Sequence, residues 1–415
     1  MTRVRDSRPI IAFALLLLTL SSCSVEAPTS ATPPSSPLTA AALQVSVSPG
    51  QDIQKAVNSL AAGGTILMKA GIYRRQSIVP KDGMTFVGEN GAILDGDGVV
   101  NFAFNGTKSG KVVANNVTIR NLEIRGYSSD LGTGPIMAAL RQNVQTSGWV
   151  VEDCNIHHNS AGGIKTGNNM VIRGNWIHDN GQVGISGSGD GILIVDNEVS
   201  INNTRDVRKT EGLAAAGGMK LLKTKNLVVR GNYFHDNNAP GIWIDRHAVN
   251  TLIENNRVIN NAGAGIFIEI SYGATVRNNT ASGNGFKNAR WLYGGGITVS
   301  STPDVEVYGN TVGLNARGIT AVHQDRGTGP LGKHEVRNLY VHDNKITMKS
   351  EDGTVTGLAV GTGESIYYTK KGNRFKDNSY CLGSQSKYFY WNSKRLTKNE
   401  WKSSGNDVGG NFGAC

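Results

Sequence analysis

Residues 231–272 carry the same pattern twice, and this repetition constrains the fold more than any other feature of the sequence. Counted from Asn232, a Gly-Ile pair begins nine residues later and Asp245 comes thirteen residues later; from Asn256, a second Gly-Ile pair and Glu269 follow at the same offsets. A short period with one Asn-rich turn and one Gly-Ile step per copy is typical of a solenoid, whose units stack coil on coil. The pattern therefore predicts that Asp245 and Glu269 lie on neighbouring coils.

The same asparagine recurs along much of the chain. Eight asparagines follow short β-rich runs at intervals of 20 to 35 residues: Asn155, Asn175, Asn197, Asn232, Asn256, Asn279, Asn310 and Asn344. A base unit of about 22 residues with insertions explains these intervals. With 53 glycines, 18% charged and 7% aromatic residues, the chain of 415 residues also fits a turn-rich repeat better than a two-layer domain. Because stacked asparagines exchange amide hydrogen bonds, we interpret this column as scaffold.

The repeats resemble those of a known superfamily. The segments VVEDCNIHHNSAGGI, MVIRGNWIHDNGQVGI, LVVRGNYFHDNNAPGI, TLIENNRVINNAGAGI and VEVYGNTVGLNARGI are similar to coils of the right-handed parallel β-helix proteins, which include pectate lyases, polygalacturonases, alginate lyases and mannuronan epimerases. The resemblance implies an all-β fold, a right-handed parallel β-helix solenoid over residues 44–350. Apolar residues at helical spacing over residues 52–60 predict a short N-terminal helix that caps it. Such a fold hosts many activities and specifies none.

Both ends of the chain depart from the repeat. Residues 1–22 combine a basic start, a short apolar run and small residues before Cys23, which resembles a bacterial lipoprotein signal. This implies cleavage and lipidation at Cys23 and a Pro/Ser/Thr-rich tether over residues 23–43, with an ordinary secretory signal as the alternative. Either way the protein belongs to the bacterial cell envelope or is secreted. Residues 351–415 are expected to form a C-terminal capping segment.

The cysteine and charge content fit an exported protein with an acidic partner. Cys381 and Cys415 flank the C-terminal segment and are expected to form a disulfide, which leaves Cys154 as a small core residue. The formal net charge is +10, and it stays at about +8 without residues 1–22. Such a charge favours an acidic polysaccharide, whereas scattered basic residues without a recognised motif argue against nucleic acid. We expect a monomer that meets the membrane only through its N-terminal lipid.

Aligning the coils at their Gly-Ile or Gly-Met steps sorts the strand residues by direction. The isoleucines of the two Gly-Ile steps and of the positions two residues later alternate with the outward residues and point inward. One outward column holds Lys165, Ser186, Lys220, Trp243, Phe267, Thr298 and Thr320. The second holds Gly167, Ser188, Leu222, Asp245, Glu269, Ser300 and Val322. Because stacked strands lie about 4.8 Å apart, Asp245 and Glu269 should emerge side by side, with Lys220 as the nearest cation.

Three functions fit this group of side chains. In the first, Asp245 and Glu269 act as acid and base, or as nucleophile, in glycoside hydrolysis. In the second, they hold Ca²⁺ or another hard cation that neutralises a uronate while Lys220 or Arg246 removes the α-proton, as the resemblance to alginate lyases and chondroitinase B implies. In the third, the face only recognises a glycan, and Trp243 stacks on a sugar ring. A solvated, salt-bridged face is the structural alternative.

We predict an enzyme that cleaves a polysaccharide, with Asp245, Glu269 and Lys220 as catalytic residues. Hydrolysis is favoured because the fuller lyase motifs of the superfamily are not recognisable; a cation-assisted lyase or epimerase and a non-catalytic glycan-binding cell-surface protein are the alternatives. Insertions at residues 202–217, 285–295 and 323–335 are expected to build walls beside this face. The predicted substrate-binding residues are Trp243, Phe267, Arg246, His247, Tyr272 and Trp291.

Overall fold

A computed structural model describes residues 43–212, 216–349 and 354–415. The predicted signal segment, Cys23 and the tether up to residue 42 lie outside this part of the chain, so lipidation stays a prediction. Among the described residues, no helix is both long and apolar enough to cross a membrane.

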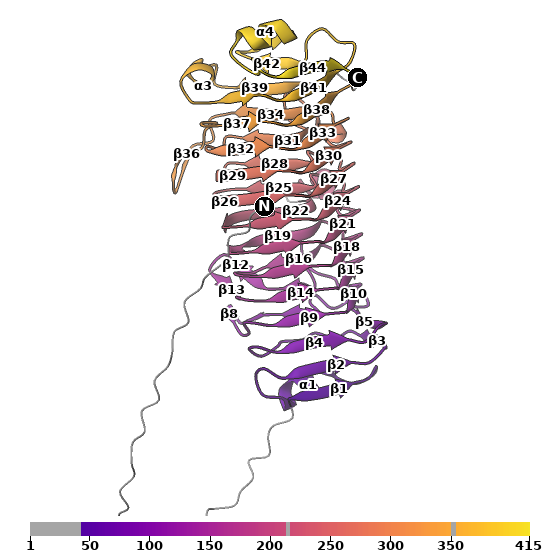
Figure 1. Ribbon diagram of the computed structural model, residues 1–415. Helices are drawn as coiled ribbons and strands as arrows, with labels where there is room; N and C mark the ends of the chain where they lie inside the picture. The colour runs from indigo at the N-terminus through magenta and orange to yellow at the C-terminus, as the bar shows by residue number, and fades with distance from the viewer. Residues whose placement is uncertain (1–42, 213–215, 350–353) are drawn as a thin grey trace, which may run out of the picture. The chain divides into compact units, whose positions relative to one another are not determined.

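The described residues form a column of stacked coils, and each typical coil contributes one strand to each of three faces (Figure 1). The first face contains β6 (Phe104–Asn105), β11 (Ile136–Met137), β16 (Gly162–Thr166), β19 (Val183–Asp190), β22 (Gly217–Lys225), β25 (Ile242–Asp245), β28 (Ile266–Glu269), β31 (Gly295–Ser300), β34 (Arg317–His323), β39 (Thr356–Val360) and β42 (Phe389–Trp391). Successive strands of this face pair in parallel.

The second and third faces are built in the same way. The second contains β1 (Gln44–Val47), β2 (Thr65–Met68), β4 (Thr85–Gly88), β9 (Thr118–Arg120), β14 (Val150–Glu152), β17 (Val171–Arg173), β20 (Leu193–Val195), β23 (Val228–Arg230), β26 (Val249–Glu254), β29 (Tyr272–Arg277), β32 (Val305–Tyr308), β37 (Tyr340–His342) and β40 (Arg374–Lys376). The third contains β3 (Gly71–Arg74), β5 (Ala92–Asp95), β10 (Glu123–Arg125), β15 (Asn155–His157), β18 (Trp176–His178), β21 (Glu198–Ser200), β24 (Tyr233–His235), β27 (Arg257–Ile259), β30 (Thr280–Ser282), β33 (Thr311–Gly313), β38 (Lys345–Met348), β41 (Ser379–Leu382) and β44 (Asn411–Ala414).

The interior of the column is filled by the inward residues of all three faces. Ile242, Ile244, Ile266 and Ile268 are fully buried, as their alternation predicted. Because the side-chain period of a strand is two, burying these four isoleucines forces Trp243 and Phe267 onto the outer side of the same strands. The hydrophobic pattern therefore sets the register that the site depends on.

The asparagine column is a hydrogen-bonded ladder inside a turn. Asn256 is typical: its Nδ2 donates to Val229 O, Glu254 O and Asn279 Oδ1, and its Oδ1 accepts from the amide N and Nδ2 of Asn232. Seven of the eight predicted asparagines belong to this ladder, which continues through Asn378 and ends on Asp407. The ladder is scaffold, since its members are buried.

Asn155 is the exception to the predicted column. The ladder position of its coil is held by the preceding residue, Cys154, whose amide donates to Asn175 Oδ1 at 3.0 Å. Asn155 instead lies in β15, in register with Trp176, and its Oδ1 is 2.9 Å from His178 Nε2. Cys154 is buried, as expected for a core residue, and it contributes its backbone amide but no side-chain amide to the ladder.

The caps follow the predictions, with one shift of boundary. Helix α1 (Ile53–Ser59) begins after Asp52, whose carboxylate accepts from Lys55 N, and it covers the first coils. Cys381 and Cys415 form the predicted disulfide. The parallel coils continue beyond the predicted limit at residue 350, because β39, β40, β41 and β44 pair in register with earlier strands. Helix α4 (Lys398–Ser403) and the β42–β43 hairpin, with β43 at Lys394–Leu396, lie at this end.

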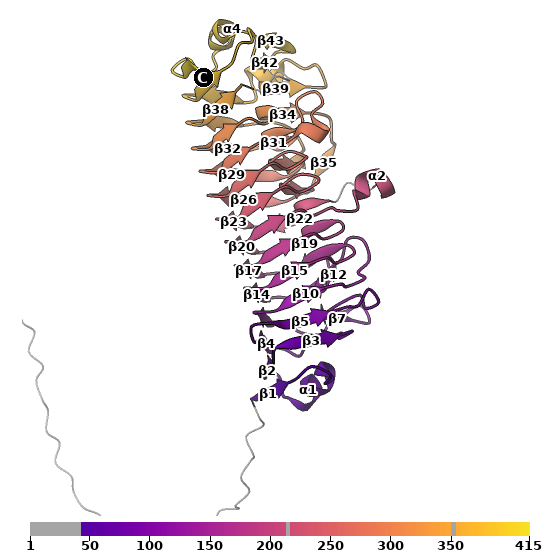
Figure 2. The ribbon, with the colours of Figure 1, turned by 90° about the vertical axis from the view of Figure 1, so that its right-hand side faces the viewer.

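Loops project from both edges of the first face. Helix α2 (Val207–Glu211) and the 3₁₀ helix η1 (Phe286–Asn288) lie on insertions that precede first-face strands, and α2 stands out from the column in Figure 2. Two hairpins follow first-face strands: β12–β13 (Ala139–Arg141 and Val144–Gln145) and β35–β36 (Thr328–Gly329 and Gly332–Lys333). A further hairpin, β7–β8 (Thr107–Lys108 and Lys111–Val112), lies nearer the N-terminus. The first face is therefore the floor of a walled groove.

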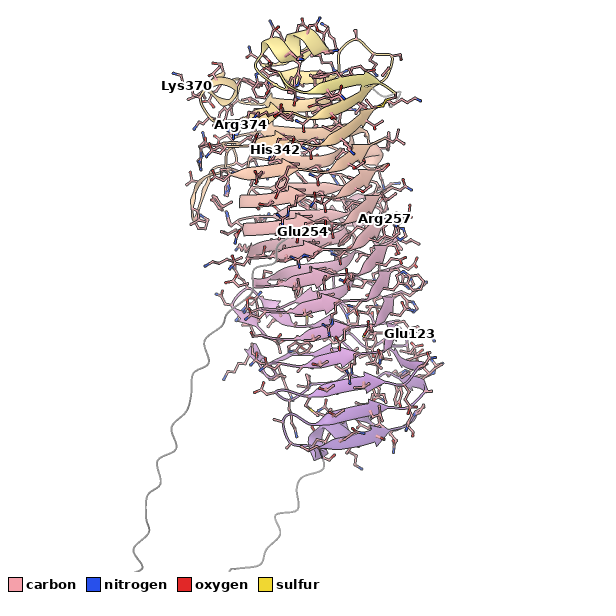
Figure 3. The ribbon with its side chains drawn as sticks, viewed as in Figure 1. Glu123, Glu254, Arg257, His342, Lys370 and Arg374 are labelled. Carbon is pink, nitrogen blue, oxygen red and sulfur yellow. A yellow bond between two sulfur atoms is a disulfide. The ribbon has the colours of Figure 1, made fainter. Side chains whose placement is uncertain are left out.

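Charged side chains cover the other two faces. Figure 3 labels Glu254 on β26, Arg257 on β27, His342 on β37 and Arg374 on β40. Glu254 is in register with Arg230 on one side and Arg277 on the other, and it forms ion pairs with both. The Arg374 guanidinium lies 3.9 Å from the centre of the Tyr340 ring. These contacts show that ion pairs between coils are ordinary on this column and do not by themselves mark a site.

Candidate active site

The floor of the candidate site is the pair of outward columns on the first face. Lys220 is in register with Trp243, and Trp243 with Phe267. In the second column Leu222 is in register with Asp245, and Glu269 with Ser300. The predicted columns are therefore present as aligned, and Asp245 and Glu269 lie on adjacent coils.

Asp245 is a buried carboxylate whose two oxygens both accept hydrogen bonds. Lys220 Nζ lies 2.9 Å from Asp245 Oδ2, and Arg246 N donates to Asp245 Oδ1 at 2.7 Å. Only 4% of Asp245 and 7% of Lys220 is exposed. Two donors, one of them charged, therefore hold this carboxyl group in place. Lys220 is thus the cation that was predicted beside the acid pair.

Glu269 has a different environment from Asp245. Arg326, from the insertion after β34, donates from Nη1 to Glu269 Oε1 at 2.8 Å. Burial, and next the negative charge of Asp245, raise the pKa of Glu269 above its ordinary value, although Arg326 and Lys220 oppose the shift. The two neighbouring carboxyl groups therefore differ in their partners, and Glu269 has an increased affinity for a proton.

This arrangement differs from the ion-pair clusters on the other faces. Glu254 has a cation in the coil on each side of it. Asp245 and Glu269 instead place two like charges on adjacent coils and leave the cations at the outer ends, Lys220 before them and Arg326 over them. Adjacent like charges are unfavourable for stability. Such an arrangement is typical of a site that serves chemistry.

The structure does not leave Trp243 and Phe267 free to stack on a sugar ring. Lys220 Nζ lies 3.2 Å from the centre of the Trp243 ring, and the Phe267 ring lies 5.3 Å away on the following coil. Because β22 and β28 flank β25, these two contacts cover both faces of the indole. Phe267 is only 8% exposed and meets Tyr293 edge-on at 6.0 Å. In this arrangement both rings support the floor, and the substrate-binding role of the two residues stays a prediction.

His247 and Tyr272 hold a wall of the groove. The His247 ring stacks on His334 at 4.9 Å, and Tyr272 OH donates to Gly332 O at 2.9 Å. His334 and Gly332 belong to the β35–β36 insertion, which also carries Arg326. Burial lowers the pKa of both His247 and His334. His247 and Tyr272 therefore fix the insertion that brings Arg326 to Glu269. Arg246, a third predicted substrate-binding residue, is exposed.

Tyr293 and Trp291 form part of the opposite wall. Tyr293 OH donates to Gln324 Oε1 at 2.7 Å and lies 3.3 Å from Ser300 Oγ. Burial raises the pKa of Tyr293, with the Glu269 charge as a further cause. Trp291 is 39% exposed, so it remains available to a ligand. Tyr293 and Arg326 lie on the inserted loops, but sequence reasoning did not assign them to the acid pair.

The residues around the acid pair do not fit a resident Ca²⁺ ion. Calcium takes six to eight oxygen ligands in proteins. Over the described ranges, no group of three or more His, Cys, Asp and Glu side chains could hold a metal ion. Lys220 and Arg326 each occupy an oxygen of the pair and supply the neutralising charge. We therefore assign no step to a metal.

Glu269→Gln is expected to change how stability depends on pH. A carboxyl group whose pKa is raised in the folded state stabilises the fold below its unfolded pKa and loses that contribution as pH rises through the folded value. The melting temperature of Glu269→Gln relative to wild type should therefore rise between pH 4 and pH 7.5, because glutamine does not ionise. Thermal unfolding followed by circular dichroism measures this difference. A constant offset across the range would contradict the raised pKa.

Comparison with known proteins agrees with the fold. Residues 142–312 match the family model described as the right handed beta helix region. The fold is a right-handed parallel β-helix. No curated protein matches the chain in sequence.

Three solved structures show the same fold at low sequence identity. The A-module of the mannuronan C-5 epimerase AlgE6 from Azotobacter vinelandii is 17% identical, with a TM-score of 0.59 over 88% of this chain and 96% of that one. A mannuronic acid specific polysaccharide family 6 lyase from human gut microbiota is 14% identical, with a TM-score of 0.59 over 90% and 91%. The catalytic unit of a GH87 alpha-1,3-glucanase from Streptomyces thermodiastaticus is 15% identical, with a TM-score of 0.55 over 91% and 70%.

Proposed function

We propose that the protein is a carbohydrate-active enzyme that cleaves a polysaccharide, with Glu269 and Asp245 as its acid pair. The observation that carries this proposal is the contrast between the two neighbours. Asp245 accepts two hydrogen bonds, one from Lys220, whereas Glu269 has a raised pKa. A carboxyl group with a raised pKa beside a second, differently bonded carboxyl group supplies the pair that glycoside hydrolysis needs.

The proposed reaction divides the work between these side chains. Protonated Glu269 donates its proton to the oxygen of the scissile glycosidic bond as that bond breaks. Asp245 stabilises the positive charge that develops on the sugar ring, which resembles an oxocarbenium ion in the transition state. Lys220 holds Asp245 in place, and Arg326 orients Glu269. Water then adds to the sugar, and the proton it loses restores the acid.

The fold comparisons support a carbohydrate substrate. The alpha-1,3-glucanase catalytic unit, the mannuronan epimerase module and the mannuronic acid specific lyase are all named for activity on polysaccharides. The groove between the walls, with the acid pair on its floor, is a suitable place for an extended glycan.

Proton abstraction from a uronate is the second candidate, and Lys220 favours it. Burial lowers the pKa of Lys220, while Asp245 opposes the shift. A lysine with a lowered pKa is more often a neutral amine near neutral pH, and a neutral amine is the general base that begins both elimination and epimerisation at the carbon next to a carboxylate. In this reaction Arg326 would neutralise the substrate carboxylate.

Digestion of a glycan library with wild type, Glu269→Gln and Asp245→Asn tests these functions. We expect new reducing ends with wild type and a loss of about 10²-fold to 10⁴-fold in each variant. Products that absorb in the ultraviolet would indicate elimination, and solvent deuterium incorporation without cleavage would indicate epimerisation. If wild type binds glycans but none of these changes occurs, the protein is a glycan-binding module and the enzyme proposal fails.

A further inference from the structure

A second cavity on the first face lies next to the acid pair, toward the N-terminus. It has a volume of about 220 Å³. Strands β16, β19 and β22 supply its floor through Lys165, Ser186 and Lys220, and the β12–β13 hairpin supplies Arg141 and Gln142. Lys220 also contacts Asp245. The cavity and the acid pair therefore share one side chain, that of Lys220.

The charge of this cavity is of one sign. Of the described residues that line it, Arg141, Lys165, Lys220 and Lys223 are basic and none is acidic. Lys165 Nζ donates to Gly132 O at 2.7 Å, but no carboxylate in the described parts of the chain forms an ion pair with it. Burial alone lowers the pKa of Lys165. A half-buried ammonium without a counter-charge is unfavourable for the protein unless a ligand supplies one.

A second observation points to a ligand in the same place. The Ser186 hydroxyl is buried, and within the described residues its Oγ has no hydrogen-bond partner. Ser186 lies between Lys165 and Lys220 in the outward column, in register with both. Unpartnered buried hydroxyls are uncommon in folded proteins and often mark a missing partner. The wall is built as well, since Gln145 Nε2 donates to Ser188 Oγ and Lys223 Nζ donates to Gln142 Oε1.

We propose that this cavity is a subsite for an anionic substituent of the glycan, either the carboxylate of a uronate or a sulfate ester. Lys165 supplies a positive charge from the floor, and the Ser186 hydroxyl donates its hydrogen to the same anion. Arg141 contacts the anion from the β12–β13 hairpin. This inference rests on the proposed function, because it names the substrate class of that groove: a polysaccharide that carries charged groups.

The subsite also sets the direction of the substrate. Lys165 lies three coils before Asp245, and stacked strands are about 4.8 Å apart, so the two groups are about 14 Å apart along the column. A ligand that contacts both must extend along the axis of the solenoid, across the strands. The charged group is therefore bound away from the bond that is cleaved.

Binding to a Glu269→Gln background tests the subsite without cleavage. Calorimetric titrations would use oligogalacturonate and oligomannuronate as carboxylate probes, a carrageenan oligosaccharide as the sulfate probe and maltohexaose as the neutral probe. We expect at least one anionic probe to bind, with an affinity that falls as salt rises. Adding Lys165→Met should weaken that binding by about tenfold or more. The probe that binds identifies the anionic group.

Matched variants keep the test decisive. Lys55→Met removes an equal charge from exposed helix α1 and should leave binding unchanged. Arg141→Gln, on an exposed hairpin position that does not affect the core, should weaken binding if Lys165→Met proves unstable. Equal binding of maltohexaose and the anionic probes, or no effect of Lys165→Met and Arg141→Gln, overturns the subsite. Charge-dependent binding with no reaction by wild type would instead overturn the proposed function alone.

Discussion

Lys220→Met is expected to destabilise the protein by about 3–5 kcal/mol, because it leaves the Asp245 carboxylate buried and without its cation. The Lys220–Asp245 ion pair is the most completely buried lysine–carboxylate contact at the site, with side chains 8% and 6% exposed. Methionine fills a similar volume, so the effect reports charge more than packing. The same variant also loses the contact between Lys220 and the Trp243 ring.

Hydrogen exchange and denaturant titration would measure this effect. Protection should fall first in β22 and β25, since the coils of a solenoid contact mainly their neighbours. The double variant Lys220→Met/Asp245→Asn should recover most of the lost stability, because it removes both charges together. If the single variant matches wild type within about 0.5 kcal/mol, the ion pair does not hold this part of the floor.

Asn256→Ala is the second large effect, and we expect it to cost at least about 3 kcal/mol. The substitution removes the hydrogen bonds from Asn256 Nδ2 to Val229 O and Asn279 Oδ1. It also removes the acceptor of the Asn232 amide N, whereas Asn232 Nδ2 still donates to Ile194 O and Arg230 O. Each buried polar group left unsatisfied costs about 1–3 kcal/mol. Several buried groups lose a hydrogen bond at once in this variant, and the buried turn gives water no access to replace them.

Asn155→Ala is the matched control for the ladder. Asn155 has the same residue type and a similar sequence context, but its side chain contacts only His178 among the hydrogen bonds of the described residues. We expect a loss below about 1 kcal/mol, measured by the same denaturant titration. Equal effects of the two substitutions would mean that the ladder is not what stabilises the turn.

The local repeat was enough to predict the fold and the register of the acid pair. Each Gly-Ile step is followed by the same alternation, and the isoleucines must be buried, so Asp245 and Glu269 could be placed on adjacent coils from sequence. The same reasoning failed at Asn155, where an asparagine one residue away from the ladder position was aligned with the others. A cysteine in place of the expected asparagine hid the true register.

Residues that contact the acid pair, such as Arg326, lie on loops outside the sequence repeat. Arg326 reaches Glu269 across a sequence separation of 57 residues, and nothing in the repeat specifies where an insertion folds back. Lys220 and Phe267 cover Trp243 because the three residues are stacked in one column. The alignment of the coils contained this stacking, but the contacts between the side chains were not considered. The sequence placed Lys165 in the outward column but did not show the cavity around it, because the wall of that cavity comes from the β12–β13 hairpin.

The end of the asparagine ladder has a consequence for assembly. Within the ladder, each asparagine side chain accepts a hydrogen bond from the coil before it and donates one to the coil after it. Asp407 takes the last position: its Oδ1 accepts from Asn378, and its Oδ2 accepts from Tyr380 OH and Trp401 Nε1. A carboxylate has no hydrogen to donate to a further coil, so the ladder ends at Asp407. A solenoid could in principle extend by stacking further coils on its last one. Because Asp407 offers no donor there, we expect the end of the ladder to disfavour stacking of coils from another molecule.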